Sequence, residues 1–219
     1  MARKFGTIKS FQLLWIAHEK LYYSIFSEAL QHLEINEEQR KYEDSISESL
    51  CPNLRKACFN HERDVATPDW EKPNQPVNTD ELKGGKIRKR PDFTCNFLNS
   101  LATSPETYEI PFHVECKRLG KTVGSWNLNK NYTTEGINRF DCVIHEYGKR
   151  APSGMMIGYI VNMDQTTILA AVSKYMLDEQ LDFNFEFKEK VVSCEQKLIR
   201  KNVIPFEFKM IHLWADLRN

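Results

Sequence analysis

Residues 90–97 read RPDFTCNF and residues 112–117 read FHVECK, and these two stretches decide the fold. In the first, apolar and polar side chains alternate with the period of two that is typical of a β-strand with one buried face. The two phenylalanines and the cysteine are predicted to point to one side of the sheet and Asp92 to the other.

The second stretch alternates in the same way. His113, Glu115 and Lys117 are predicted to lie on one face, opposite the apolar residues. A carboxylate and an ammonium group would then project side by side from one strand. Pairing this strand with the earlier one would bring Asp92 to the same place, and two carboxylates together favour a hard-oxygen site for Mg²⁺ or Mn²⁺.

The other elements are predicted from the spacing of apolar residues. Residues 11–33 are expected to form an amphipathic helix. A second helix should follow Asn36, its predicted N-cap, until Pro52 bends or ends it. A loop is expected at 67–85, which is rich in Pro and Gly. Beyond the two strands, helices are predicted at 132–147 and 164–181, a buried central strand at 155–161, and a last strand at 206–213.

This order of elements predicts an α/β fold in which helices flank a mixed central sheet. The chain of 219 residues is expected to form a single domain. Its parts would be N-terminal helices at 1–66, a loop or elaboration at 67–89, and the core with the C-terminal strands at 90–219.

Arg90-Pro91-Asp92, followed after a hairpin-length gap by Val114-Glu115-Cys116-Lys117, resembles the PD…(D/E)XK signature of the restriction-endonuclease-like nuclease superfamily. The resemblance covers the central part of the chain, and both halves of the signature fall on predicted strands with matching faces. It implies a restriction-endonuclease-like fold and a metal-dependent endonuclease that hydrolyses phosphodiester bonds.

The resemblance also implies roles for these residues. One or two Mg²⁺ or Mn²⁺ ions would be held by Asp92, Glu115 and the backbone carbonyl of Cys116, and would lower the pKa of bound water and neutralise charge on the phosphate. Lys117 would orient or help deprotonate that water and stabilise the transition state.

In that superfamily the first helix often supplies a further acidic residue. Glu43 is the candidate for this catalytic role, because it shares a helix face with Ile46 and Leu50. Asp44 and Glu48 are weaker candidates. The alternative, that Glu43 is an ordinary surface glutamate, has equal weight.

Positively charged residues are concentrated in short stretches of the sequence and are balanced by acidic residues over the whole chain. Lys plus Arg and Asp plus Glu each total 30, so the formal net charge is zero and no whole-molecule field would attract a polyanion. Basic residues flank both strands and are predicted to bind substrate phosphates, although such runs are often solvated loops. These substrate-binding candidates are Arg88, Lys89, Arg90, Arg118, Lys121 and Arg139, with Tyr132 in the same cleft for stacking on a base.

A cytoplasmic protein without membrane segments is expected, because six cysteines are scattered without a C-x-x-C pair and the N-terminus matches neither a signal peptide nor a membrane span. DNA is the expected partner ahead of RNA, and defence against foreign DNA the expected role, by analogy alone. Three alternatives stay open: an RNA-cleaving enzyme of the same fold, a non-catalytic nucleic-acid-binding or assembly subunit, and a dependence on homodimerisation or on a partner protein that targets or activates the chain.

Overall fold

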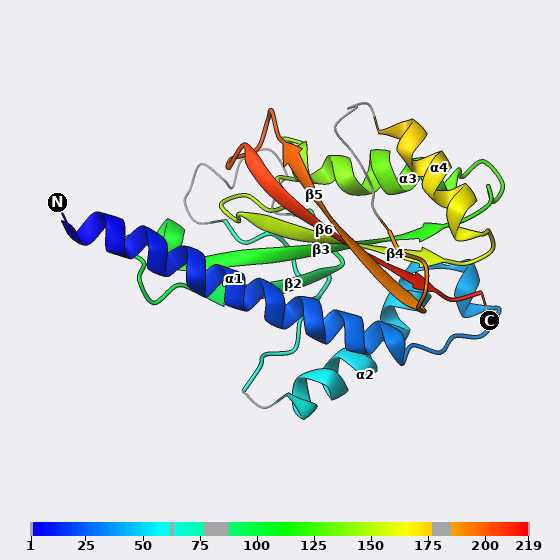
Figure 1. Ribbon diagram of the computed structural model, residues 1–219, viewed down its shortest axis with the longest axis horizontal. Coiled ribbons are helices and arrows are strands. Elements are labelled where there is room, and N and C mark those ends of the chain that lie inside the picture. The colour runs from blue at the N-terminus through cyan, green and yellow to red at the C-terminus, as the bar shows by residue number, and fades with distance from the viewer. Residues whose placement is uncertain (1, 62–63, 77–87, 177–184, 219) are drawn as a thin grey trace.

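The structure is a computed structural model that describes residues 2–61, 64–76, 88–176 and 185–218. Its centre is a mixed six-stranded sheet in the order β1-β2-β3-β4-β6-β5 (Figure 1). Strands β3, β4 and β6 run parallel to one another, and the other pairings are antiparallel. The strands are β1 (Asp69–Trp70), β2 (Phe93–Leu98), β3 (Glu109–Leu119), β4 (Ser153–Ile160), β5 (Val191–Ile199) and β6 (Glu207–Asp216).

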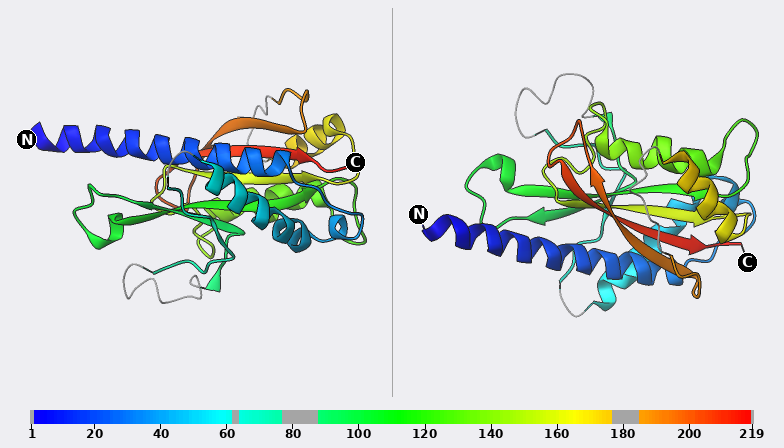
Figure 2. Two further views of the ribbon diagram at one scale, coloured as in Figure 1. Left: turned by 90° about the horizontal axis from the view of Figure 1, so that it is seen from below. Right: turned by 45° about the horizontal axis from the view of Figure 1, so that its top comes forward.

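Helices cover both faces of the sheet (Figures 1 and 2). On one face, α1 (Ala2–Gln31) and α2 (Glu43–Asn60) pack on a core that includes Phe93 and Val114. On the other face lies a second core, covered by α3 (Leu128–Asn131), a π-helical turn η4 (Tyr132–Gly136), a 3₁₀ segment η5 (Ile137–Asp141) and α4 (Gln165–Tyr175). The predicted class, a mixed sheet flanked by helices, is therefore confirmed.

Strand β4 shows why the sheet is central. All eight of its residues are buried, as expected of a strand that has parallel neighbours on both sides and helices on both faces. The apolar stretch at 155–161 predicted this strand correctly. The strand predicted at 206–213 is also confirmed, as part of β6.

The predicted N-cap of α2 was wrong, and one of the two outcomes expected at Pro52 is excluded. Asn36 does not cap the helix: the side chains and backbone N–H groups of Asn36 and Gln39 bond each other around the 3₁₀ turn η1 (Gln39–Lys41), and α2 begins only at Glu43. Pro52 does not end the helix, since α2 continues to Asn60; the alternative, that Pro52 bends the helix, stays a prediction. Proline removes one N–H group, and the buried side chains of Leu50 and Leu54 on either side hold the helix in place.

Other predictions were correct in part. In the segment 132–147 only η4 and η5 are helical, and residues 142–147 form no helix. Helix α4 confirms 165–175 of the helix predicted at 164–181, with Asp164 as its N-cap; residues 177–181 lie outside the described ranges. In the loop predicted at 67–85, Asp69–Trp70 add a short strand, and 77–85 lie outside those ranges.

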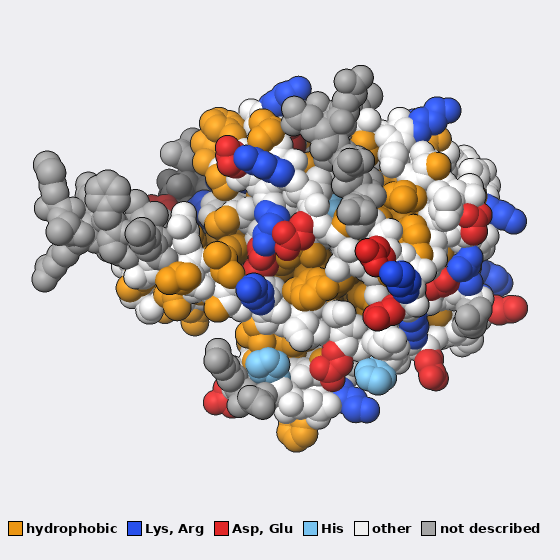
Figure 3. Space-filling view, viewed as in Figure 1, with side chains coloured by type: hydrophobic (Ala, Val, Ile, Leu, Met, Phe, Trp, Pro, Cys, Tyr) orange, Lys and Arg blue, Asp and Glu red, His pale blue; other side chains and the backbone are white. Residues whose placement is uncertain are grey.

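Charges of both signs are mixed over the face drawn in Figure 3, in keeping with the zero formal net charge. Among the helices that the structure describes, none has the combined length and apolar character that a bilayer span requires.

The end of the β2–β3 pairing positions the candidate site. Strand β2 pairs with β3 only up to Phe93, which lies opposite Val114. From Glu115 to Leu119, β3 pairs with β4 on one side, and its other edge has no strand partner among the described residues. Backbone groups along this open edge of β3 are therefore left for side chains to satisfy.

Candidate functional site

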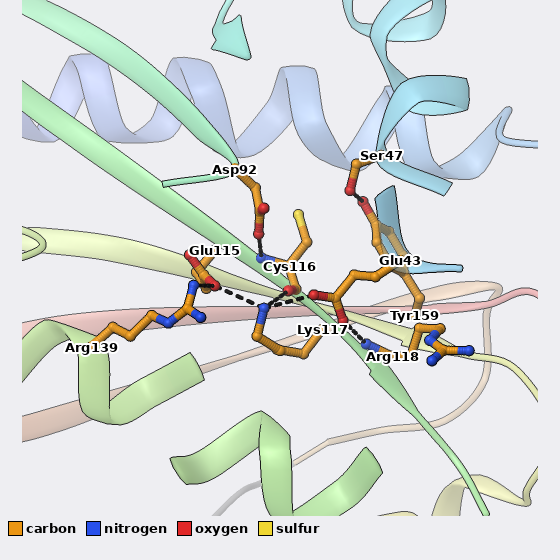
Figure 4. A network of polar contacts seen from close by, with 9 residues as sticks. All are labelled: Glu43, Ser47, Asp92, Glu115, Cys116, Lys117, Arg118, Arg139 and Tyr159. Atoms are coloured by element: carbon orange, nitrogen blue, oxygen red, sulfur yellow. Dashed lines mark hydrogen bonds and ion pairs between the residues drawn. The ribbon is translucent and has the colours of Figure 1, made fainter. Parts of the chain in front are cut away.

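Side chains from four parts of the chain meet at the open edge of β3 (Figure 4). Glu115 and Lys117 come from β3 itself, and Asp92 lies just before β2. Glu43 comes from the first turn of α2 and Arg139 from η5. The structure therefore brings together all four residues predicted as catalytic, although they are far apart in sequence.

Lys117 lies at the centre of this cluster. Its Nζ atom donates to Glu43 Oε1 and to the Cys116 carbonyl oxygen, at 2.7 Å in each case. The same atom is 2.8 Å from Glu115 Oε1. The side chain is only 9% exposed, so three oxygens replace most of the water that would otherwise hydrate the ammonium group.

Glu115 is fully buried, and one of its carboxylate oxygens forms ion pairs with two cationic side chains. Besides Lys117, the Arg139 guanidinium lies 2.5 Å from Glu115 Oε1. The other oxygen, Oε2, is buried and has no hydrogen-bond partner among the described residues. A buried carboxylate oxygen without a partner is costly, and it indicates a position at which a further cation or donor would stabilise the protein.

Asp92 and Glu43 bond the backbone of the open edge. Asp92 Oδ2 accepts from the Cys116 N–H at 2.5 Å, and Glu43 Oε2 accepts from the Arg118 N–H at 2.9 Å. Two carboxylates therefore replace a neighbouring strand as acceptors for β3, which fixes their positions relative to Glu115.

Burial dominates the ionisation of the cluster. It raises the pKa of Asp92 well above the ordinary value, and the nearby charge of Glu115 raises it further. Burial also raises the pKa of Glu115, although the charges of Lys117 and Arg139 oppose the change. Burial alone would lower the pKa of Lys117, but the charges of Glu115, Glu43 and Asp92 outweigh it and leave the pKa above its usual value. The lysine is therefore a cation throughout the physiological pH range.

The residues present fit a divalent cation. Asp92, Glu115 and the Cys116 carbonyl supply hard oxygen donors, the class that Mg²⁺ and Mn²⁺ prefer. Three carboxylates, including that of Glu43, face two cations, and Glu115 Oε2 is unpartnered within the described ranges. Those ranges contain no group of three His, Cys, Asp or Glu side chains already disposed around a metal. The fit is thus to two side chains and a main-chain carbonyl, with Lys117 as the competing cation.

Tyr132 is not in a cleft, so its predicted role in stacking on a base was wrong. Its side chain is fully buried in the second core, where its hydroxyl accepts from Trp214 Nε1 at 3.0 Å and lies 2.7 Å from His212 Nδ1. Burial lowers the pKa of His212 to about 3, so the ring is neutral. Its Nδ1 atom accepts a hydrogen bond from the Tyr132 hydroxyl.

The other predicted substrate ligands lie in different settings. Arg139 is bound to Glu115 rather than free for a phosphate. Arg118 donates to the Lys41 carbonyl, which ties β3 to the start of α2. Lys121 is exposed beyond the end of β3, and before Asp92 the chain has exposed Arg88 and Arg90 and half-buried Lys89.

Two residues that sequence analysis missed support the cluster. The Ser47 and Tyr159 hydroxyls lie 3.3 Å apart and are buried beside Glu43 and Cys116 (Figure 4). Ser47 follows Glu43 by one helical turn, so a polar stripe at this spacing was the available signal.

No protein-family model, curated protein or solved structure was found to match this chain. The interpretation of the site therefore depends on the residues and geometry described above.

Proposed function

We propose that this protein is a Mg²⁺- or Mn²⁺-dependent nuclease of restriction-endonuclease-like fold, with DNA as the preferred substrate. One observation carries the proposal: Asp92, Glu115, Lys117 and Glu43 converge at the open edge of β3. Two carboxylates and an adjacent lysine meet the chemical needs of phosphodiester hydrolysis, because they can bind a divalent cation and supply a positive charge beside it.

The proposed metal ligands are Asp92, Glu115 and the Cys116 carbonyl. A bound Mg²⁺ would lower the pKa of a water molecule and neutralise charge on the scissile phosphate. Glu43 would keep Lys117 in position, since its carboxylate bonds both the ammonium group and the β3 backbone.

Lys117 acts in this proposal as a cation and not as a base. Its raised pKa keeps the amine protonated, and a general base works best with a pKa near the working pH. The ammonium group would orient the attacking water and stabilise the negative charge that develops on the phosphate. Arg139, held on Glu115, would help to keep that carboxylate ionised.

The proposed setting is the reducing cytoplasm, because all six cysteines are free thiols. A role in defence against foreign DNA is an analogy with the superfamily that the signature resembles.

Cleavage assays test the function. Single- and double-stranded DNA and RNA are incubated with the wild-type protein and Mg²⁺ or Mn²⁺, with EDTA as the metal-free control. Asp92→Ala, Glu115→Ala and Lys117→Ala should each lower the cleavage rate by at least about 100-fold, as loss of a transition-state contact typically does. Glu48→Ala, an exposed change on the same helix as Glu43, should leave the rate unchanged. Cleavage that survives EDTA or all three substitutions refutes the proposal.

One observation favours a second candidate, a non-catalytic nucleic-acid-binding or assembly subunit. Lys117 and Arg139 already compensate part of the acidic charge, and Asp92 and Glu43 already satisfy backbone N–H groups. Such a cluster could serve only to hold α2 on the sheet. Calorimetric titration with Mn²⁺ separates the two: binding that Glu115→Ala abolishes supports the nuclease, and no binding supports the subunit.

A further inference from the structure

A pocket lies on the same sheet face as the acidic cluster. Its volume is about 320 Å³, and the β2–β3 hairpin forms its floor. Thr94 and His113, which lie directly opposite each other in that hairpin, line the floor. Residues 72–76 and the segment 105–111 form its sides.

The pocket is close to the proposed metal ligands. His113 and Glu115 are two residues apart on β3 and share a face, so they are separated by roughly 7 Å along the strand. A nucleotide whose phosphate lies at Glu115 could therefore place its own base at His113 if that base is unstacked from its neighbours.

The floor offers a hydrogen-bond donor. His113 is 4% exposed, and its Nδ1 atom accepts from the Gly148 N–H at 3.1 Å. Because Nδ1 is the acceptor in this bond, the ring proton lies on Nε2. No described residue bonds this Nε2–H group.

Two more polar groups are unsatisfied there. The Thr94 hydroxyl, on a residue only 5% exposed, and the Asn74 side-chain oxygen are buried without a partner in the described part of the chain. Buried polar groups normally have partners, so these groups suit a ligand that presents both donors and acceptors.

The walls of the pocket combine flat apolar rings with polar and charged side chains, which are those of Lys72, Asn74, Gln75, Glu109 and Arg150. The ring of Tyr108, 55% exposed, stands at the pocket together with Pro73, Pro105 and Pro111. An aromatic side chain of this kind can stack on a planar heterocycle.

We infer that this pocket binds an unstacked nucleobase, that of the nucleotide whose phosphate is cleaved. Every base combines a flat ring with an edge of donors and acceptors, which matches the walls and the floor. The location beside the scissile phosphate depends on the proposed nuclease function, whereas base binding itself does not. A substrate whose base must leave the stack should be single-stranded or locally unpaired.

Saturation-transfer difference NMR in EDTA tests base binding without any cleavage. The probes are adenosine and cytidine, with ribose 5-phosphate to detect a simple anion site. Both nucleosides should bind the wild-type protein, and Tyr108→Ala should weaken binding at least about fivefold through lost stacking. Thr94→Val, which keeps the side-chain shape, should also weaken it. Phe206→Ala is the matched control, because this ring is 56% exposed and lies outside the pocket.

Nucleosides that do not bind, or that bind both pocket variants as well as the wild type, overturn the inference. Binding of ribose 5-phosphate alone also overturns it. These results are independent of the nuclease: a wild-type protein that fails to cleave any substrate with Mg²⁺ refutes the proposed function but leaves nucleoside binding to be decided by NMR.

Discussion

Lys117 is the residue on which the chemistry of the cluster depends. It lies among three oxygens at 2.7–2.8 Å, in a setting that would otherwise suit a metal ion. Asp92 and Glu115 have raised pKa values even with this ammonium group present. Lys117 thus stabilises the cluster without metal and competes for the same oxygens when metal binds.

Replacing Lys117 should therefore separate binding from catalysis. Lys117→Met removes the competing charge and keeps much of the side-chain length, so the affinity for Mn²⁺ should rise roughly tenfold, about 1.4 kcal/mol, while cleavage is lost. Isothermal titration calorimetry measures the affinity. Lys121→Met, at an exposed site beyond β3, should change neither property. Weaker Mn²⁺ binding in Lys117→Met would mean that the lysine supports the metal and does not compete with it.

Alternation along a strand predicts which residues share a face, and this is why Asp92, Glu115 and Lys117 could be grouped from the sequence. It does not predict which polar side chains will pair. Tyr132 was wrongly expected at the surface because its partners, His212 and Trp214, are 80 or more residues away. Arg139 was expected near the site, but its partner Glu115, 24 residues away, was not foreseen, because the pattern of a strand does not show which cation will reach it.

The hydrogen bonds from α2 to β3 come from the first turn of the helix. Glu43, in the first turn of α2, accepts from Lys117 Nζ and from the Arg118 N–H. Arg118 in turn donates to the Lys41 carbonyl just before the helix. The start of α2 is thereby fixed to the open edge of β3.

Removing this contact should cost stability. Glu43→Ala leaves the Arg118 N–H without this acceptor and removes one of the three oxygens around the Lys117 ammonium group, so the free energy of unfolding should fall by about 1.5–3 kcal/mol. Urea unfolding in EDTA measures the change. Glu48→Ala, exposed on the same helix, should change the value by less than about 0.5 kcal/mol. Equal effects of the two substitutions would show that Glu43 does not anchor α2.

Elements with a continuous apolar pattern were predictable, and those defined by pairing were not. Strand β5 was missed: its inward positions include the buried polar Gln196, and its outward positions carry Ser193, Glu195 and Lys197, as suits a strand at the edge of a sheet. Strand β1 has two exposed residues and exists only through its pairing with β2. Neither the apolar period nor the turn residues carry that information.

Across the whole molecule, the cluster joins segments that are far apart in sequence. Glu43 comes from α2, Asp92 from the residue just before β2, Glu115 from β3 and Arg139 from η5. A cation bound by this cluster would bridge Asp92 and the β3 residues, so its binding energy should add to the stability of the complete fold.

Metal should therefore raise the melting temperature, and the rise should depend on pH. At 100 times its Kd a ligand adds about 2.7 kcal/mol, or about 5–10 °C for a chain of this size. The raised pKa of Asp92 means that the metal-free folded state binds its proton more tightly than the unfolded state. This carboxyl group therefore favours the metal-free fold more as pH falls, while the proton increasingly competes with metal. The shift caused by Mg²⁺ should thus be larger at pH 8 than at pH 6.

Asp92→Asn should abolish the shift and leave the metal-free protein at least as stable, since an amide oxygen can still accept from the Cys116 N–H. Asp44→Asn, an exposed change in the first turn of α2, should keep the shift. Differential scanning fluorimetry with and without Mg²⁺ measures all three proteins, and an equal shift in Asp92→Asn and the wild type would place the metal elsewhere.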